Sequence, residues 1–245
     1  MLYEPWSVFV SNGEVFLCET FTDRARKLLA NGDMVYITGG ENETLGDGKL
    51  ATLSRLYGPM AIVVSSSNQV YISEGYNHRI RKINRNGILS TIAGNGEEGY
   101  NGDGQLATDA KLRHPRGLFV SDEDEVYFCD CQNHRVRKID RFGMISTVAG
   151  NGQCGYNGDD QLATSAQLSC PTGVFVHRNE IYISESENNR IRKVLQNGNI
   201  ITIAGTGQYG FNGDGHQATR TTLSSPLHCL STTITFTLQI APAIV

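Results

Sequence analysis

Short runs of apolar residues, or of alternating apolar and polar residues, follow one another along this chain with turn-forming residues between them. Residues 60–65 are apolar and β-branched, residues 69–73 are rich in Val, Tyr and Ile, and residues 79–84 alternate charged and aliphatic side chains. Residues 88–93 form a further apolar run after an Asn-Gly pair, which is typical of a tight hairpin. Four such runs predict a four-stranded antiparallel blade. Sustained helical periodicity is missing from the sequence.

This pattern repeats with a period of ~55 residues, which is typical of propellers and other repeat folds. Each repeat begins at a proline, continues through an Arg-x-Arg-Lys run and closes with a small residue followed by Gly. We therefore predict an all-β fold, a β-propeller of four-stranded antiparallel blades with four complete blades. The repeats lie within residues 1–226, and a divergent tail (227–245) is expected to form one strand. The four predicted repeats span residues 5–58, 59–114, 115–170 and 171–225.

The number of blades in the closed ring does not follow from the repeats alone. Three closures agree with the sequence: a four-bladed ring, an open arc completed by another chain, and a truncated part of a six-bladed parent. Six blades of this period would need about 330 residues, and the chain has 245. We expect an incomplete six-bladed ring, whose unpaired blade edges would permit self-association.

A glycine-rich connection with the pattern Gly-aromatic-Asn-Gly-Asp ends each of the later repeats. Connections between strands that are as long as these are uncommon in a compact domain, and they are usually functional or pack against the body of the protein. Turns in which Asn or Asp bonds its own backbone would also explain the composition. Calcium needs six or more oxygen ligands, and each loop supplies one or two aspartates. The candidate binding residues in these loops are Tyr100, Asn101, Asp103, Tyr156, Asn157, Asp159, Phe211, Asn212 and Asp214.

An acidic residue precedes each Arg-x-Arg-Lys run by five positions. Both faces of an interior blade are covered, and a lone buried charge is costly, so we expect a structural ladder of arginine–carboxylate pairs. The alternative is a ring of basic residues that binds phosphates or an acidic peptide. The predicted pairs are Glu19 with Arg24, Glu74 with Arg79, Asp130 with Arg135, and Glu185 with Arg190.

These motifs together resemble the NHL repeat, and most closely the long-loop variety of teneurin-type propellers. The resemblance rests on Asn-His-Arg at residues 77–79 and 133–135, on the Arg-x-Arg-Lys strand, on Ser-Thr-Ile-Ala-Gly at 90–94 and on the Gly-Tyr-Asn-Gly-Asp-Gly loop. The first repeat departs with Thr-Asp-Arg at 22–24, and the fourth with Asn-Asn-Arg at 188–190. The resemblance implies a six-bladed propeller that serves as a platform for proteins and, in some branches, for RNA.

Charge and cysteine usage narrow the function further. A net charge of −4 disfavours a nucleic-acid surface, and no apolar run is long enough to span a bilayer. The start of the sequence does not look like a signal peptide, so a cytoplasmic location is expected if the N-terminus is complete. The six cysteines do not recur with the repeat, apart from Cys18 and Cys129, so we expect them to be reduced and free of metal.

Catalytic motifs are missing: there is no Ser–His–Asp arrangement and no metal-binding histidine pair. His78 and His134 recur as blade elements and are expected to be structural. We therefore predict a non-enzymatic scaffold that needs no cofactor and binds a protein or peptide through its loops. The alternatives are an RNA-binding propeller and a propeller hydrolase or lyase.

Overall fold

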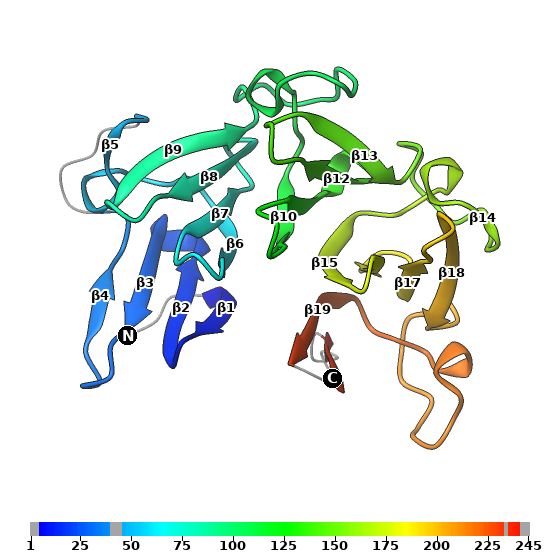
Figure 1. Ribbon diagram of the computed structural model, residues 1–245. Coiled ribbons are helices and arrows are strands. Elements are labelled where there is room, and N and C mark those ends of the chain that lie inside the picture. Colours follow the sequence, from blue (N-terminus) through cyan, green and yellow to red (C-terminus); the bar gives the residue numbers. More distant parts are fainter. Residues whose placement is uncertain (1–4, 40–45, 233–234, 241–245) are drawn as a thin grey trace. The chain divides into compact units, whose positions relative to one another are not determined.

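The protein is built from short β-strands and single 3₁₀ turns. The computed structural model describes residues 5–39, 46–232 and 235–240. The described strands form four sheets of four or five strands and one sheet of two strands (Figure 1). This arrangement confirms the predicted all-β propeller fold with four-stranded antiparallel blades.

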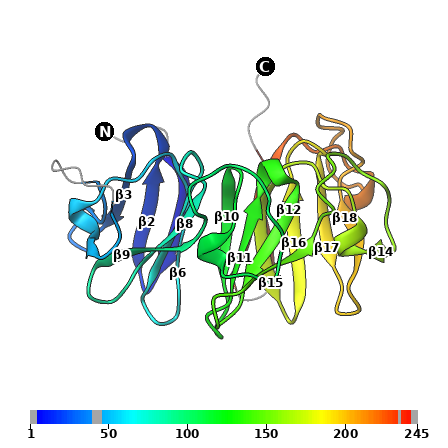
Figure 2. The same ribbon diagram turned by 90° about the horizontal axis from the view of Figure 1, so that it is seen from above.

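Each blade follows the chain from strand to neighbouring strand. Blade 1 contains β1 (Pro5–Ser11), β2 (Glu14–Glu19), β3 (Arg24–Leu28) and β4 (Met34–Tyr36). Blade 2 contains β6 (Pro59–Val64), β7 (Val70–Glu74), β8 (Arg79–Ile83) and β9 (Ile88–Ala93). Blade 3 contains β10 (Pro115–Val120), β11 (Val126–Asp130), β12 (Arg135–Ile139) and β13 (Ile145–Ala149). Blade 4 contains β15 (Pro171–His177), β16 (Glu180–Glu185), β17 (Arg190–Val194) and β18 (Asn199–Ala204), of which β16 to β18 lie side by side in Figure 2.

Shorter elements complete the structure. Two two-residue strands, β5 (Lys49–Leu50) and β14 (Gln161–Leu162), add a fifth strand to blades 2 and 4. In the tail, β19 (Pro226–Thr232) pairs antiparallel with β20 (Thr235–Ile240), so two strands form where one is expected. The 3₁₀ turns of the described residues are η1 (Thr20–Thr22), η2 (Ala51–Leu53), η3 (Ala107–Asp109), η4 (Cys131–Asn133), η5 (Ala163–Ser165) and η6 (Ala218–Arg220).

The glycine that closes each repeat is required by a close approach of two backbone segments. Gly94 has a φ of +89°, and a Cβ there would lie 2.1 Å from the carbonyl oxygen of His78. Gly150 and Gly205 have φ values of +92° and +90° and would meet the equivalent carbonyl at 2.2 Å. Only glycine combines this backbone conformation with the missing side chain. This requirement explains the glycine that closes repeats 2, 3 and 4, whereas a Cβ at Gly39 of repeat 1 would lie 3.2 Å from the equivalent carbonyl.

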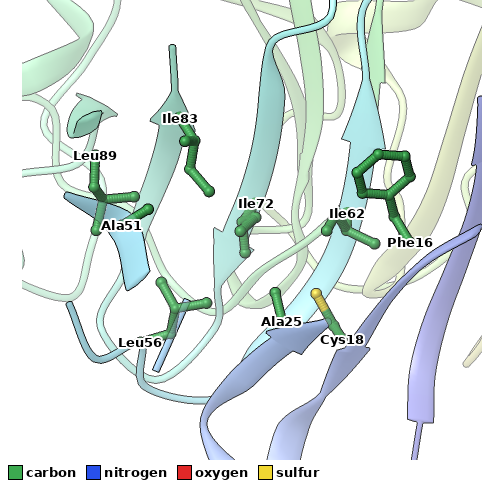
Figure 3. Close-up of a cluster of buried hydrophobic side chains, with 9 residues drawn as sticks. All are labelled: Phe16, Cys18, Ala25, Ala51, Leu56, Ile62, Ile72, Ile83 and Leu89. Atoms are coloured by element: carbon green, nitrogen blue, oxygen red, sulfur yellow. The ribbon is translucent and has the colours of Figure 1, made fainter. Parts of the chain in front are cut away.

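The chain forms two compact units, residues 1–126 with 139–145, and residues 127–138 with 146–245. A hydrophobic core lies in the first unit, where side chains of blades 1 and 2 pack together (Figure 3). In the second unit, Ile191 and Leu223 are buried against Phe175 and Ile203. The first of these cores contains Phe16, Cys18, Ala25, Ala51, Leu56, Ile62, Ile72, Ile83 and Leu89.

One leucine three residues before each proline anchors the glycine-rich connection. Leu56, Leu112 and Leu168 are fully buried, and Leu223 is 6% exposed. Their burial removes apolar surface from water and fixes the end of the loop before the next blade begins. No helix among the described residues is long and apolar enough to cross a membrane.

Candidate functional site

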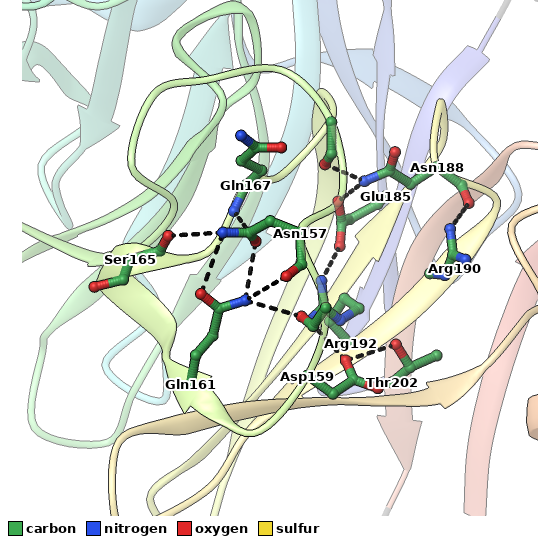
Figure 4. Close-up of polar contacts among 12 residues, drawn as sticks. Asn157, Asp159, Gln161, Ser165, Gln167, Glu185, Asn188, Arg190, Arg192 and Thr202 are labelled. Carbon is green, nitrogen blue, oxygen red and sulfur yellow. Dashed lines mark hydrogen bonds and ion pairs between the residues drawn. The ribbon is translucent and has the colours of Figure 1, made fainter.

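The glycine-rich loops are numbered by repeat: loop 1 (46–52), loop 2 (99–108), loop 3 (155–164) and loop 4 (210–219). The predicted binding residues lie in loops 2, 3 and 4. In loop 3, Oδ1 of Asn157 accepts from the backbone amide of Gln167 at 2.7 Å, and its Nδ2 donates to the Ser165 carbonyl at 3.3 Å (Figure 4). The side chain of Gln161 also donates to Oδ1 of Asn157, at 3.0 Å. Asn157 therefore shapes its own loop.

The same asparagine brace recurs in loops 2 and 4. Asn101 accepts from the amide of Lys111 at 2.8 Å, and Asn212 accepts from the amide of Thr222 at 2.9 Å. Each asparagine also donates to the carbonyl of the residue eight positions later. Because these polar groups find partners inside the loop, the recurring asparagine stabilises the loop's conformation.

Beyond the aspartate, loops 1 and 3 join the following blade. Strand β5 in loop 1 pairs antiparallel with β9, and strand β14 in loop 3 pairs antiparallel with β18. The alanine after each strand is buried: Ala51 and Ala163 are each 2% exposed. Loops 1 and 3 are therefore docking segments that start in one repeat and end on the sheet of the next.

The loop aspartate ties this docking segment to a buried arginine. In loop 3, Oδ1 of Asp159 lies 2.9 Å from Nη2 of Arg192 and accepts a hydrogen bond from the Thr202 hydroxyl at 3.0 Å (Figure 4). In loop 1, Asp47 makes the same two contacts, with Arg81 at 2.8 Å and with the Thr91 hydroxyl at 3.1 Å. Asp159 and Asp47 therefore hold their loops to the next blade.

The loop aromatic has a structural contact as well. Tyr156 lies under two guanidinium groups of blade 4, with its ring centroid 3.9 Å from Cζ of Arg190 and 4.8 Å from Cζ of Arg192. The aromatic residues and the arginine strand therefore meet at this blade, which sequence spacing does not reveal. In loop 2, the Tyr100 hydroxyl donates to Asp103 at 3.3 Å.

Loop 4 differs from the others in its exposure. Phe211 is 75% exposed, whereas its repeat equivalent Tyr156 is 37% exposed. Asp214 and Ala218 are exposed as well, in contrast to the buried Ala163. Tyr209, two residues before Phe211, is 63% exposed. Loop 4 thus presents to solvent the residue types that loop 3 uses for docking.

Each blade buries one arginine–carboxylate pair, and its arginine is the second one of the Arg-x-Arg-Lys run. The prediction named the first arginine of each run, whereas these ion pairs join the same carboxylates to the second arginine. The second arginine lies inside the sheet, where a charge needs a carboxylate, whereas the first lies at the end of the strand. The four ion pairs are Arg26–Glu19 at 3.3 Å, Arg81–Glu74 at 2.8 Å, Arg137–Asp130 at 3.3 Å and Arg192–Glu185 at 3.3 Å.

The buried carboxylates are further held by side chains and backbone. Glu185 accepts from the side chain of Asn188 and from the backbone amide of Ser169 at 2.9 Å. Burial raises the pKa of Glu185, while Arg192 and the Ser169 amide act in the opposite direction. The first arginines of the runs instead reach polar groups at the blade ends, as when Arg190 donates to the Thr206 carbonyl at 2.8 Å. Arg24, Arg79 and Arg135 donate to the Tyr36 hydroxyl, the Asn95 carbonyl and the Asn151 carbonyl.

A recurring contact that sequence reasoning missed ties the start of each Arg-x-Arg-Lys run to the end of the connection that leads to the next blade. The residue before each Arg-x-Arg-Lys run accepts a hydrogen bond from the backbone amide that precedes the next proline. The equivalent position holds Asp, His or Asn, all of which can accept such a bond, and this chemical similarity was the available signal. The four bonds are Gly58 to Asp23 at 2.8 Å, His114 to His78 at 3.3 Å, Cys170 to His134 at 3.2 Å and Ser225 to Asn189 at 3.0 Å.

The expectation that all cysteines are reduced is wrong for one pair. Cys131 and Cys170 form a disulfide with an S–S distance of 2.04 Å. Recurrence did not reveal the pair, because the equivalent positions of repeat 1, Thr20 and Gly58, hold no cysteine although they lie near each other. The Thr20 hydroxyl donates at 2.7 Å to the carbonyl of Pro59, the residue after Gly58. Cys18, Cys129 and Cys154 are thiols outside any disulfide, and the side chain of Cys229 lies outside the described part.

The described residues contain no group of three or more His, Cys, Asp or Glu side chains that could hold a metal ion. Burial raises the pKa of the Cys18 thiol, which keeps it protonated and unreactive inside blade 1.

A family model described as the teneurin NHL domain matches residues 11–101 and 95–155 of this chain. Teneurin-m of Drosophila melanogaster is 31% identical over 182 residues, which cover 68% of this chain and 6% of that protein. Teneurin-4 of Mus musculus is 29% identical over 226 residues, which cover 79% of this chain and 8% of that protein. The chain thus spans less than a tenth of the length of these relatives.

Among solved structures, virginiamycin B lyase from Staphylococcus aureus superposes with a TM-score of 0.53 at 17% identity. The match covers 81% of this chain and 55% of the lyase. At this identity the likeness concerns the fold alone.

Proposed function

Since this chain belongs to the teneurin NHL domain family, we propose that it is a non-enzymatic scaffold that binds a protein or peptide through loop 4. The contrast between loops 3 and 4 carries the proposal. Tyr156 and Asp159 of loop 3 are engaged with blade 4, whereas Phe211 and Tyr209 of loop 4 are 75% and 63% exposed. Exposed aromatic side chains supply much of the binding energy at protein interfaces.

The RNA alternative depends on arginines that phosphates could reach. Arg81, Arg137 and Arg192 are at most 2% exposed and lie against carboxylates. Counterion release requires cationic groups at the surface, so this set does not provide the salt-dependent binding typical of a nucleic-acid site. Likeness to a lyase at the level of the fold gives no support for catalysis, because one fold hosts many activities.

Capture of partners on the immobilised protein, quantified by mass spectrometry, tests the proposal. We expect Phe211→Ala to lose the specifically captured proteins, because the most exposed aromatic side chain of loop 4 is removed. Phe142→Ala is the matched control: Phe142 is 70% exposed but lies in the hairpin between β12 and β13. Equal capture by wild type and Phe211→Ala, or equal loss in both variants, would contradict the assignment to loop 4.

A further inference from the structure

A cavity of about 380 Å³ is lined by residues of blades 1 and 2 and of loop 1, all within the first compact unit. Phe16 and Ile83, which belong to the core shown in Figure 3, line it together with Val64 and Val70. Pockets of this size with a largely apolar lining and a few polar groups are typical of small-molecule sites.

The cavity lies near the hairpin ends of the strands. Asn12 and Asn68, in the β1–β2 and β6–β7 hairpins, line it and are joined by a hydrogen bond of 3.1 Å. The described residues on either side of 40–45 contact other parts of the same strands: Gly39 packs against the start of β3, and Asp47 contacts an arginine of β8. The site argued below therefore depends on described strands and hairpins.

Phe16 distinguishes this place from the equivalent positions of the other blades, which hold tyrosine. The phenylalanine is 5% exposed, and the tyrosines are buried to a similar degree. The lysine beside the ring recurs as well: Lys27 Nζ lies 5.4 Å from the ring centroid of Phe16, and Lys193 Nζ lies 5.3 Å from that of Tyr182. Blade 1 thus keeps the buried ring and its lysine but lacks the hydroxyl. The equivalent tyrosines are Tyr71, Tyr127 and Tyr182, which are 2%, 9% and 6% exposed.

Blade 4 shows which contact the hydroxyl makes. The hydroxyl of Tyr182 donates to Oε2 of Glu180 at 3.1 Å, and Nζ of Lys193 lies 2.7 Å from the same oxygen. In blade 1 the equivalent ion pair joins Lys27 to Glu14 at 2.5 Å, and both residues line the cavity. The side chain of Glu14 is 41% exposed, whereas that of Glu180 is 23% exposed. The carboxylate of Glu14 can therefore accept a hydrogen bond from a molecule in the cavity.

We propose that this cavity binds a small neutral phenol whose hydroxyl donates to Glu14. The ring lies on the apolar lining, and its hydroxyl makes the contact that Tyr182 makes in blade 4. Glu14 and Lys27 are the charged groups among the described lining residues, and they already neutralise each other. A charged ligand would need an unpaired partner of opposite sign, so an uncharged one fits better. The inference goes beyond the proposed function, because loop 4 lies in the second compact unit.

A ligand-observed NMR titration with 4-ethylphenol tests the site. 4-Ethylanisole has the same ring but no hydroxyl donor, and it should bind about tenfold more weakly, as expected for a lost hydrogen bond to a charged group. Phe16→Tyr should weaken the binding of 4-ethylphenol by about fivefold or more, because the new hydroxyl occupies Glu14 as Tyr182 occupies Glu180. Since tyrosine is the native residue at the equivalent positions, this variant should fold, which circular dichroism checks.

Glu14→Ala tests the hydroxyl contact separately. The two ligands should bind this variant with equal affinity, because the acceptor is gone. Glu180→Ala is the matched control, since it removes the equivalent carboxylate of blade 4 and should keep the preference for the phenol. A wild type that binds neither ligand, a Phe16→Tyr variant that binds 4-ethylphenol like the wild type, or a preference that survives in Glu14→Ala would overturn the proposal.

Two further results separate this site from other roles. Tighter binding of the peptide Gly-Tyr-Gly than of 4-ethylphenol would overturn the assignment to a free small molecule, because a tyrosine side chain of a partner protein would then be the occupant. Phe16→Tyr should leave partner capture unchanged, and Phe211→Ala should leave phenol binding unchanged, so the cavity and loop 4 can fail independently.

Discussion

The residue before each Arg-x-Arg-Lys run shows how different side chains perform one task. Asp23, His78, His134 and Asn189 all have left-handed backbone, with φ values of 57°, 54°, 52° and 49°. Asn, Asp and His are the non-glycine residues that adopt this conformation most often. Each of the four also accepts a hydrogen bond from the backbone amide of the last residue of its own repeat. The departures from the Asn-His-Arg motif therefore keep both the backbone conformation and the hydrogen bond.

His78 makes this contact sensitive to pH. Its Nδ1 accepts the His114 amide and must be unprotonated to do so. Burial lowers the pKa of His78; Arg113 acts in the same direction and Glu98 opposes it. The neighbouring His114 ring, 5.4 Å away, also has a pKa lowered by burial. The unfolded chain then binds protons more readily than the folded protein, so acidification favours unfolding.

We predict that His78 makes its full contribution to the free energy of unfolding above about pH 6.5, the pKa of an unperturbed histidine. This contribution is lost as the pH falls through the lowered pKa of His78 in the folded protein. His78→Asn should reduce this decrease, because asparagine accepts the same amide without titrating, as Asn189 does. Urea denaturation over a series of pH values measures both curves. A variant with the same pH dependence as the wild type would assign the effect to other groups.

At the scale of elements, the glycine-rich loop is the unit that joins one repeat to the next. Loop 3 combines an internal brace, an ion pair from Asp159 to the buried Arg192 and the short strand β14. Loop 4 has the same brace, and its aspartate, Asp214, is exposed to solvent, whereas Asp159 contacts Arg192 and Thr202. Loops of similar sequence therefore differ in their contacts, since Asp159 joins its loop to Arg192 of blade 4.

This difference predicts unequal effects of equivalent substitutions. Asp159→Ala should reduce the free energy of unfolding by about 1–3 kcal/mol, because it removes a charge-assisted hydrogen bond to a buried arginine. Asp214→Ala should change it by less than about 0.5 kcal/mol, as expected for an exposed residue. Urea denaturation of both variants provides the comparison. Equal losses would show that the ion pair to Arg192 does not stabilise the fold.

At the scale of the whole molecule, a disulfide among the described residues supplements the repeated contacts. The disulfide joins Cys131, in the turn after β11, to Cys170, which precedes β15, and the two residues are separated by 39 positions. Both cysteines belong to the second compact unit. A cross-link over this length restricts the unfolded chain and thereby stabilises the folded one.

We predict that Cys131→Ser combined with Cys170→Ser lowers the free energy of unfolding by about 2–4 kcal/mol. Treatment of the wild type with a reductant should have a comparable effect. Cys154→Ser is the matched control, because Cys154 is free and exposed. Urea denaturation with and without reductant measures the difference, and a wild type that is indifferent to reductant would contradict the role of the bond.

The blades were predictable because strand and turn signals are local. The strands expected at 60–65, 69–73, 79–84 and 88–93 lie within one residue of those in blade 2. The contact between Tyr156 and Arg190 was not predictable, since it joins residues 34 positions apart through the path of the loop. Likewise, five-residue spacing suggested Arg190 as the partner of Glu185, whereas depth inside the sheet selects Arg192. The disulfide was not predicted for the same reason, because the distance between Cys131 and Cys170 depends on how the repeats pack.

The attachment of loops 1 and 3 to the blade that follows them gives the array a polarity. The fifth strand of blades 2 and 4 belongs to the loop of the preceding repeat. Excising one repeat would therefore disturb its successor more than its predecessor, and a foreign repeat grafted into the series would have to match its two neighbours in different ways.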